Sequence, residues 1–462
     1  MISTTRRRLL RIKRLAPCLA VALALDNDAL AAFDRIAARQ LLIRSPVAPS
    51  SWRVPTLPVT SCEDDGGPGT LRSVVADAES GAIIDLSELT CSTISLANGA
   101  IAVPFESLTF VGPGSALLSL DANQSYRRII EHSGHGILNI AGLRVSGGWA
   151  PTPAYGGCIY SAGSIDLYDV AVAFCKAVGA PGQQTKGGGI YAAGSLTLRH
   201  SIVSGNESNP DTDGFGGGAF AGGGLYMYYS TVRGNYALNL GSGGGYGGGL
   251  FVLGNVNIFA STIADNSAVN VGGVAIAGYA MGAVVVNSTV SGNRATQFIA
   301  GVYSNTPLYL YNSTIAFNTA AQQSATIVTA GGLQIYATGA DLQSSIIANN
   351  TAGGIAFDVG TSGGASVVGA NNLIRTASNL MPADTIIDDP QLMPLQNNGG
   401  ETATLALAPS SPAIDRGNTT NPSPNDQRGA GYVRSFGARA DIGAFELQVG
   451  DLLFRDGFEG GL

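Results

Sequence analysis

The chain has 462 residues, 64 of them glycine, and a formal net charge of −7. A hydrophobic fraction of 45% excludes an intrinsically disordered chain, because enough apolar surface is available for a buried core. The acidic balance argues against nucleic acid or an anionic membrane surface as a partner.

Residues 1–31 have the pattern of a secretory signal peptide. A basic start precedes a short apolar run from Leu15 to Leu25, and Ala29-Leu30-Ala31 is a small-x-small cleavage site. The apolar run is too short to span a bilayer, and no later segment has the composition of a membrane helix. We therefore expect a secreted or cell-surface protein. Cleavage would remove six positive and two negative charges, which leaves a net charge of −11.

Residues 32–58 are expected to be an irregular leader, and residues 59–98 an N-terminal cap. The stretch Thr70–Ser80 has the spacing of one amphipathic helix, with its apolar residues on a single face. Stacked-repeat folds need such a cover over their first repeat. The cap segment also resembles, in part, the Cys-Ser-Leu-Arg-Glu-Ala type module of secreted β-helix proteins, through the residues Thr70 to Val75.

Residues 99–380 carry a repeated sequence. The clearest copies read GGGIYAAGSLTLRHSIVSGN (187–206), GGGAFAGGGLYMYYSTVRGN (216–235) and GGGLFVLGNVNIFASTIADN (247–266). Self-similarity at a period of about 20–50 residues indicates a solenoid, propeller or array. Apolar residues alternate within each copy, which predicts strands, and strands this short bury their apolar face only by stacking copy on copy. A β-propeller would need longer strands and blades of about 40 residues.

We therefore predict an all-β fold, a right-handed parallel β-helix with an N-terminal capping helix. An asparagine closes most copies, and stacking places these asparagines above one another, where they can form a hydrogen-bonded ladder. The Gly-Gly-apolar and x-x-Asn pairs resemble the repeats of polymorphic outer-membrane proteins and other right-handed β-helix repeat proteins, over about residues 130–380. This resemblance implies a fold and no particular activity.

Residues 381–447 follow the last repeat and carry three further motifs. These are DDPQLMPLQNNGGETATLALAPSSPAIDRG (388–417), DQRG (426–429) and DIGAFE (441–446). In combination they resemble the Q-type choice-of-anchor module that follows β-helix repeats in exported bacterial proteins. That resemblance implies residence at the cell surface or outside the cell. Residues 448–462 are expected to be a short C-terminal tail.

Four cysteines remain after the predicted cleavage, and an even number in an exported chain suggests disulfides. We favour the pairs Cys62–Cys91 and Cys158–Cys175. The alternative is a set of buried free thiols. A metal site is not expected, because the cysteine spacing is wide and the chain has three histidines.

Aromatic residues recur at two fixed offsets in the repeat. Both offsets lie between inward positions, so alternation turns the side chains outward and stacking arranges them in two stripes. The first stripe consists of Tyr160, Tyr191, Phe220, Phe251 and Tyr303. The second stripe consists of Tyr168, Arg199, Tyr228, Phe259 and Tyr311. Stacked rings can simply stabilise the solenoid, or they can form a platform for sugar rings or a partner surface.

The acidic residues give weaker evidence for a functional site than the aromatic stripes do. A glycoside hydrolase needs two carboxyl groups about 5–10 Å apart, and no acidic residue of the repeat has a carboxylate at a neighbouring offset in the next copy. Asp169, His200 and Tyr229 share one offset in successive copies, as an acid–base column or by coincidence. Asp211 and Asp213 form either a calcium loop or a plain turn.

The leading hypothesis is a secreted or surface-displayed β-helix that binds glycans in an adhesin-like role without catalysis. One alternative is a polysaccharide-degrading lyase or glycoside hydrolase, and another is a structural surface component. No catalytic residue, metal site or cofactor is assigned. The candidate partners are a polysaccharide or another surface protein, and the sequence leaves the oligomeric state open.

Overall fold

A computed structural model describes residues 55–150, 152–238, 243–278, 282–323, 329–418, 423–448 and 451. The chain divides into two compact units, of which one comprises residues 1–53 and 420–424. The other unit, Val54–Thr419 with Asn425–Leu462, contains all the elements that follow. The predicted signal peptide, most of the leader and most of the tail lie outside the described residues. No helix within the described residues is long and apolar enough to cross a membrane.

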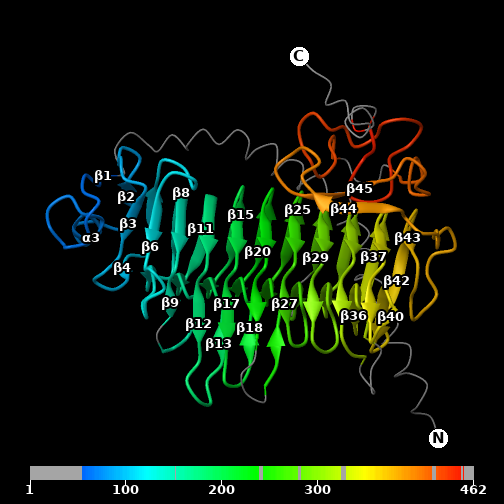
Figure 1. Ribbon diagram of the computed structural model, residues 1–462, viewed down its shortest axis with the longest axis horizontal. Coiled ribbons are helices and arrows are strands. Elements are labelled where there is room, and N and C mark those ends of the chain that lie inside the picture. Colours follow the sequence, from blue (N-terminus) through cyan, green and yellow to red (C-terminus); the bar gives the residue numbers. More distant parts are fainter. Residues whose placement is uncertain are drawn as a thin grey trace, which may run out of the picture. The chain divides into compact units, whose positions relative to one another are not determined.

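The described chain is a parallel β-helix, as predicted (Figure 1). A typical coil contributes one strand to a first sheet, two to a second and one to a third, and these strands pair in parallel with their equivalents one coil away. The first sheet contains β4 (Ile101–Val103), β7 (Ile130–His132), β10 (Ile159–Ser161), β14 (Ile190–Ala192), β19 (Ala219–Ala221), β24 (Leu250–Val252), β28 (Val274–Ile276), β32 (Val302–Ser304), β36 (Leu333–Tyr336) and β41 (Val359–Ser362).

The second sheet is the largest. It contains β1 (Thr56–Pro58), β2 (Ile83–Asp85), β3 (Thr93–Ser95), β5 (Leu108–Val111), β6 (Ser119–Asp121), β8 (Ile137–Ser146), β11 (Ser164–Ala173), β15 (Leu196–Arg199), β16 (Ile202–Ser204), β20 (Leu225–Tyr228), β21 (Thr231–Arg233), β25 (Val256–Phe259), β26 (Thr262–Ala264), β29 (Ala283–Val286), β30 (Thr289–Ser291), β33 (Leu308–Tyr311), β34 (Thr314–Ala316), β37 (Gly339–Gln343), β38 (Ile346–Ala348), β42 (Ser366–Ala370) and β43 (Leu373–Ile374). Parallel pairing between β1 and β2 means that stacking begins in the last residues of the segment predicted as an irregular leader and continues through the predicted cap.

Three smaller sheets complete the described strands. The third sheet contains β9 (Trp149–Ala150), β12 (Lys176–Val178), β17 (Glu207–Asn209), β22 (Tyr236–Ala237), β27 (Ser267–Ala268), β31 (Arg294–Ala295), β35 (Thr319–Ala320), β39 (Thr351–Ala352) and β40 (Ile355–Ala356). The fourth contains β13 (Thr185–Lys186), β18 (Gly214–Phe215) and β23 (Gly245–Tyr246), and a hairpin is formed by β44 (Leu392–Gln396) and β45 (Thr404–Leu407).

The described part of the chain contains a short helix, α3 (Leu71–Ala76), whose N-cap Thr70 accepts a hydrogen bond from the N–H of Ser73 on its hydroxyl. It is shorter than the predicted span, because the chain must turn at Gly81 to deliver β2 into the second sheet. Leu71 and Val75 are buried in the main core. Arg72 forms an ion pair with Asp64 at 2.9 Å and donates hydrogen bonds to main-chain carbonyls at residues 99 and 100. These contacts hold α3 against the first coils.

A buried asparagine ladder runs along the solenoid, as the repeat predicted. Each Nδ2 donates to the Oδ1 of the asparagine one coil further on, at 2.8–2.9 Å, and each backbone N–H donates to the same oxygen at 3.0 Å. A second Nδ2 hydrogen bond reaches a main-chain carbonyl. The rungs are Asn206, Asn235, Asn266, Asn293, Asn318 and Asn350, all fully buried. Every polar group at this corner is therefore satisfied without water.

The two ends of the ladder differ from its middle. At the start, Cys175 occupies the slot, its N–H donates to Asn206 at 3.0 Å, and its sulfur is bonded to Cys158. At the end, Asp358 accepts two hydrogen bonds from Asn350 on Oδ1 and two from Thr376 on Oδ2. A carboxylate suits this last rung because it accepts on both sides, and burial raises its pKa. Both predicted disulfides are confirmed, the other being Cys62–Cys91.

The chain after the last coil folds back over the second sheet (Figure 1). This C-terminal segment, residues 389–418 and 425–448, docks on the outer side of the strands from β26 to β43. Gln427, which is fully buried, donates to the hydroxyl of Thr262 at 2.9 Å and accepts from the hydroxyl of Thr289 at 2.6 Å. The N–H of Ala444 donates to the hydroxyl of Thr314 at 3.0 Å. The DQRG and DIGAFE motifs thus supply contacts with three successive coils.

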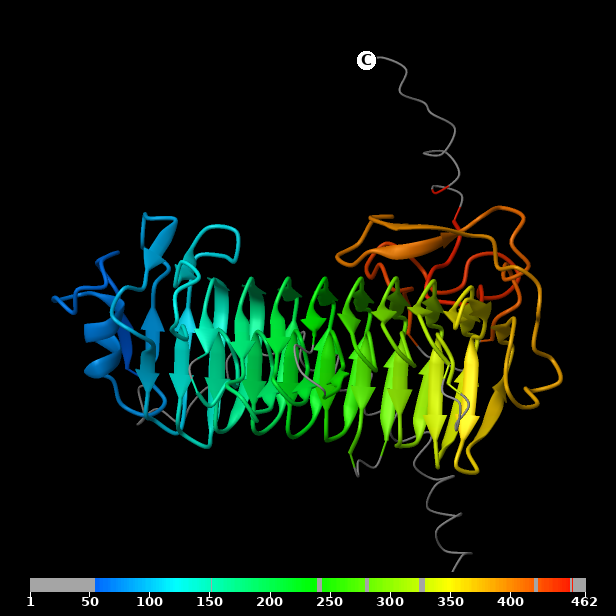
Figure 2. The ribbon, with the colours of Figure 1, turned by 60° about the horizontal axis from the view of Figure 1, so that its bottom comes forward.

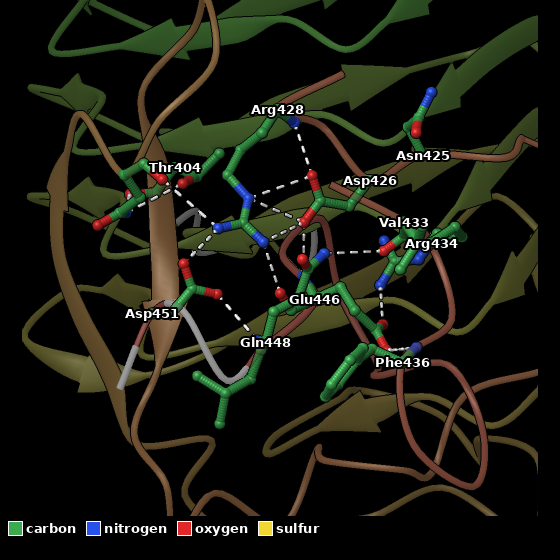
Figure 3. Close-up of polar contacts among 12 residues, drawn as sticks. Thr404, Asn425, Asp426, Arg428, Val433, Arg434, Phe436, Glu446, Gln448 and Asp451 are labelled. Carbon is green, nitrogen blue, oxygen red and sulfur yellow. Dashed lines mark hydrogen bonds and ion pairs between the residues drawn. The ribbon is translucent and has the colours of Figure 1, made fainter. Parts of the chain in front are cut away.

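A buried charge cluster holds this segment together (Figure 3). The guanidinium of Arg428 pairs with Asp426 at 2.8 Å, and both side chains are fully buried. Arg428 also lies 3.9 Å from the ring centres of Tyr432 and Phe445. Arg434 pairs with Glu446 at 2.9 Å. Burial raises the pKa of Glu446 to about 7, although Arg434 lowers it against that effect.

We expect Asn266→Ala to lower the free energy of unfolding by about 3 kcal/mol or more. The change strands buried partners on both neighbouring coils, and each unsatisfied buried group costs about 1–3 kcal/mol. Asn257→Ala is the matched control, because Asn257 lies on an outward position of β25 and is half-buried. Denaturant unfolding measures both; equal midpoints would contradict a structural role for the ladder.

The raised pKa of Glu446 predicts that stability falls between about pH 4.5 and pH 7. The folded state binds a proton in this window that the unfolded state has released, so rising pH favours unfolding, by up to about 3 kcal/mol across the window. Glu446→Gln removes this titration. Unfolding midpoints measured from pH 4.5 to 8 should therefore slope more steeply in the parent than in the variant; parallel curves would contradict the assignment.

Candidate functional site

One row of outward-facing residues runs along the second sheet. It is covered by the C-terminal segment in the later coils and exposed to solvent in the earlier ones. Register pairs its members coil by coil, in the order Thr93, Ser119, Arg144, Ala171, Ile202, Thr231, Thr262, Thr289, Thr314, Ile346 and Leu373. From Thr262 onward every member is at most 1% exposed, because the C-terminal segment covers it. Before that point the members are exposed or half-buried, and Ile202 is 43% exposed.

We call the part of this row from Thr93 to Thr231, with its flanking corners, the open stretch. Figure 2 shows the orange and red C-terminal segment above the green and yellow coils, ending before the teal coils. At the far end of the open stretch lies a cleft of about 330 Å³. Its lining includes Ser119, Asp121, Asn123, Arg144, Ser146 and Phe174. The cleft therefore combines hydroxyls, an amide, a carboxylate, a guanidinium and an aromatic ring.

The cleft carboxylate already has hydrogen-bond donors. Asp121 accepts from the N–H of Asn123 at 2.6 Å and from the hydroxyl of Ser146 at 3.0 Å. The hydroxyls of Ser146 and Ser119 lie 3.3 Å apart. Arg144, in contrast, forms no ion pair with any carboxylate among the described residues. Its guanidinium lies 5.8 Å from the ring centre of Phe174.

Phe174 presents an aromatic ring to solvent at the edge of the cleft. It is 54% exposed, and its φ of 57° is a left-handed conformation that bulky residues rarely adopt. Its ring lies over Gly205, one coil further on, where an added side-chain carbon would approach the ring to 3.0 Å. Gly205 thus leaves room for the ring. Strained backbone that exposes an apolar ring beside a polar cleft is a recognised sign of a binding site.

A histidine–carboxylate pair stands at the other end of the open stretch. The Nδ1 of His200 contacts the Oε2 of Glu401, which belongs to the C-terminal segment. The His200 ring stacks on Tyr229 with centres 5.4 Å apart and meets Tyr168 edge-on at 5.4 Å. Burial raises the pKa of Tyr229, and the Glu401 carboxylate raises it further. Of the column predicted at this offset, Asp169 is engaged elsewhere, accepting from the hydroxyl of Ser115 at 2.7 Å.

The first aromatic stripe stacks as predicted but is not an open surface. Ring centres of Tyr160, Tyr191, Phe220 and Phe251 follow one another at 5.3–5.6 Å with nearly parallel planes. Ala275 separates Phe251 from Tyr303. The expected exposure is wrong for Phe220 and Phe251, which are 4% and 8% exposed. They form a separate apolar cluster with residues of the variable loops, including Phe215, Tyr246 and Val271.

Cations cover further ring faces of this stripe. Arg128 lies 5.0 Å from the Tyr160 ring centre, and Lys186 lies 5.3 Å from that of Phe220. Tyr191 and Phe220 are each stacked between two other rings, so neither face of these rings is free for a sugar. This geometry favours the stabilising interpretation of the first stripe, and its ligand-binding role stays a prediction.

The second stripe is uneven. Tyr168 is 50% exposed, Tyr311 is 4% exposed, and Val286 separates Phe259 from Tyr311. Arg199 pairs with Asp166 at 2.6 Å and lies 5.9 Å from the Tyr168 ring centre. The remaining members, Tyr228 and Phe259, are half-buried. The stripe is therefore no continuous exposed aromatic track, and its ligand-binding role also stays a prediction.

The other acidic residues singled out from the sequence have structural partners. Asp211 accepts from the N–H of Gly182 at 2.6 Å, and Asp213 accepts from the N–H of Gly244 at 2.7 Å. Glu207 pairs with Lys176 at 3.2 Å. Within the described ranges no group of three or more His, Cys, Asp or Glu side chains is placed to hold a metal ion. These contacts tie neighbouring coils together, which favours the turn interpretation of 211–213.

Sequence reasoning missed the cleft and its two principal residues. Arg144 lies in an early copy that lacks the glycine-rich signature, and Phe174 occupies a slot that is glycine in the next two copies, Gly205 and Gly234. A phenylalanine at a position where the next two copies have glycine could have indicated this site from the sequence. Nothing in the sequence indicated that Glu401 bounds the open stretch, because this boundary depends on the contact of Glu401 with His200, two hundred residues away in the chain.

No protein-family model matches the chain, and no curated protein matches it in sequence. Among solved structures the chain is similar to pectate lyase Pel9A, with a TM-score of 0.39 and 12% identity, over 86% of this chain and 98% of that chain. It is also similar to the PL6 family alginate lyase AlyGC, with a TM-score of 0.32 and 12% identity, over 76% of this chain and 55% of that chain. At these scores neither likeness carries an argument about function. The family resemblances of the repeats and of the C-terminal motifs stay predictions.

If the first stripe stabilises the fold, Phe251→Ala should lower the free energy of unfolding by about 3 kcal/mol or more, as for other buried phenylalanines. Tyr168→Ala, at an exposed position of the second stripe, should cost less than about 1 kcal/mol. Thermal and denaturant unfolding of both variants measures the difference. If both variants lose a similarly small free energy of unfolding, Phe251 would again be a candidate ligand contact.

Proposed function

We propose that this protein is an exported β-helix that binds a polysaccharide chain along the open stretch. The observation that carries the proposal is Phe174, whose exposed ring is held by a left-handed backbone over Gly205 and beside a polar cleft. A sugar ring has an apolar face and a rim of hydroxyls. It therefore needs an aromatic surface next to hydrogen-bonding groups, and the cleft offers both.

The polar lining supports the proposal. Hydroxyls donate and accept, so Ser119 and Ser146 suit a polyol ligand, and the guanidinium of Arg144 adds donors in a fixed fork. The side-chain hydroxyl of Thr231 and the ring of Tyr229 extend this surface toward the C-terminal segment. A chain lying along the solenoid axis would meet the same kind of surface in successive coils, because the coils stack in register.

The support for export comes from the disulfides and the sequence motifs, and not from the similar solved structures. Two disulfides are typical of chains that fold in an oxidising compartment. The predicted signal peptide and the choice-of-anchor resemblance agree with it. An adhesin-like, surface-displayed binder is the form of this proposal that fits all three.

Phe174→Ala should weaken polysaccharide binding about tenfold or more, since the sugar would lose its stacking surface. Phe317→Ala is the matched control: Phe317 occupies the same corner of a later coil, with a φ of 61° and 40% exposure, but lies outside the cleft. Co-sedimentation and calorimetric titration against a panel of neutral and acidic polysaccharides would measure both. Equal affinities for the two variants and the parent would exclude the cleft as the binding site.

Cleavage of the bound chain is the second candidate function, favoured by the His200–Glu401 pair. A carboxylate on Nδ1 fixes the tautomer and leaves Nε2 to accept a proton, and the His200 side chain is 36% exposed on the open stretch. The experiment is to assay release of new sugar ends in the same binding mixtures. We expect none in the adhesin-like case. Ends that appear with the parent and vanish with His200→Gln would establish catalysis instead.

A further inference from the structure

Two arginines on the open stretch have no carboxylate partner. Arg144 lies in the cleft, and Arg233 ends β21 as an exposed residue. Neither forms an ion pair with a carboxylate among the described residues, whereas Arg72, Arg128 and Arg199 each do. Unpaired guanidinium groups stand out in a chain whose net charge is −7.

The carboxylates of the same surface are already engaged. Asp121 accepts two hydrogen bonds within the cleft, and Glu401 contacts His200. Asp169 accepts from Ser115. These hydrogen bonds do not cancel the charge of the carboxylates. They do leave the two guanidinium groups without a carboxylate partner of their own, so these are the groups that can take a carboxylate from a ligand.

The two arginines lie three coils apart, on neighbouring outward rows of the second sheet. The register passes from Arg144 through Ala171 and Ile202 to Thr231, three coil steps, and Arg233 is two residues further along the strand of Thr231. At roughly 4.8 Å per coil the guanidinium groups belong to coils about 14 Å apart along the axis. Phe174 lies between them, at the corner that follows Ala173.

We propose that the polysaccharide bound here is anionic, with carboxylates on separate residues of one chain held by Arg144 and Arg233, and a sugar ring between them stacked on Phe174. The inference rests on the proposed function of the open stretch and adds the charge class and direction of its ligand. Arginine suits carboxylates because its planar fork donates two parallel hydrogen bonds.

The test compares each polymer with its own neutral form. Polyglucuronate, polymannuronate and polygalacturonate are titrated beside their carboxyl-reduced counterparts, against the full chain and the variants Arg144→Gln, Arg233→Gln and Arg294→Gln. Arg294, exposed on the third sheet at β31, is the matched control. We expect at least one uronate polymer to bind more tightly than its reduced form. Each open-stretch variant should lose about tenfold in affinity and the control should lose none.

The outcomes separate the two proposals. Equal affinity for a polymer and its reduced form, still lost in Phe174→Ala, would keep polysaccharide binding and overturn the anionic ligand. Binding of a uronate polymer that Arg294→Gln weakens as much as Arg144→Gln would also overturn it, since charge alone and not the open stretch would then hold the ligand. No binding of any polymer would overturn the proposed function itself.

Discussion

The closure of one buried corner in every coil is the constraint on which this structure depends. Three short strands cannot satisfy the main-chain groups of a sharp turn, and water is excluded from it. Asparagine solves the problem because its amide donates twice and accepts twice. Asn235, for example, donates to a carbonyl of the preceding coil and to Asn266 of the next coil, and it accepts both hydrogen bonds from Asn206 of the preceding coil. The ladder holds the coils in a common register, and that register aligns every other row of side chains.

The residues at the two ends of the ladder also match the hydrogen-bonding groups around them. The coil before Cys175 has Gly148 in this slot and so offers no side-chain acceptor, and Cys175 anchors its corner through the bond to Cys158. The last rung has donors on both sides, and Asp358 replaces the amide with a group that only accepts. Neither substitution breaks the register. Each changes the chemistry where the repeating environment stops.

Register also explains why function is expected at exceptions. Rows of like residues stabilise a solenoid, and the outer threonines from Thr262 onward are used to dock the C-terminal segment. Arg144 and Phe174 depart from the residue types of their rows, and both line the same cleft. The left-handed corner recurs along the solenoid, and Phe317 shares it, so the polar cleft beside the ring is what distinguishes Phe174.

The repeat allowed the parallel β-helix, the asparagine ladder and the cysteine pairs to be predicted, because each follows from alternation or from chain proximity. It did not allow the burial of Phe220 and Phe251 to be predicted, since that depends on variable loops folding back over the first sheet. The cleft lies where the copies are weakest in sequence. The extent of the open stretch depends on contacts between residues more than a hundred positions apart, such as Thr262 with Gln427, and no local pattern records them.

The docked C-terminal segment divides the solenoid into two parts that tolerate change differently. Inserting or deleting a coil among those that carry Thr262 to Leu373 would misalign the C-terminal segment with part of its contacts, such as those of Gln427 with Thr262 and Thr289 or that of Ala444 with Thr314, so this part is fixed in length by its cover. A coil inserted between Phe174 and His200 would disturb no such contact and would lengthen the open stretch by roughly 4.8 Å. Duplication of a single repeat at that place would therefore lengthen the open stretch while the docked end stays the same.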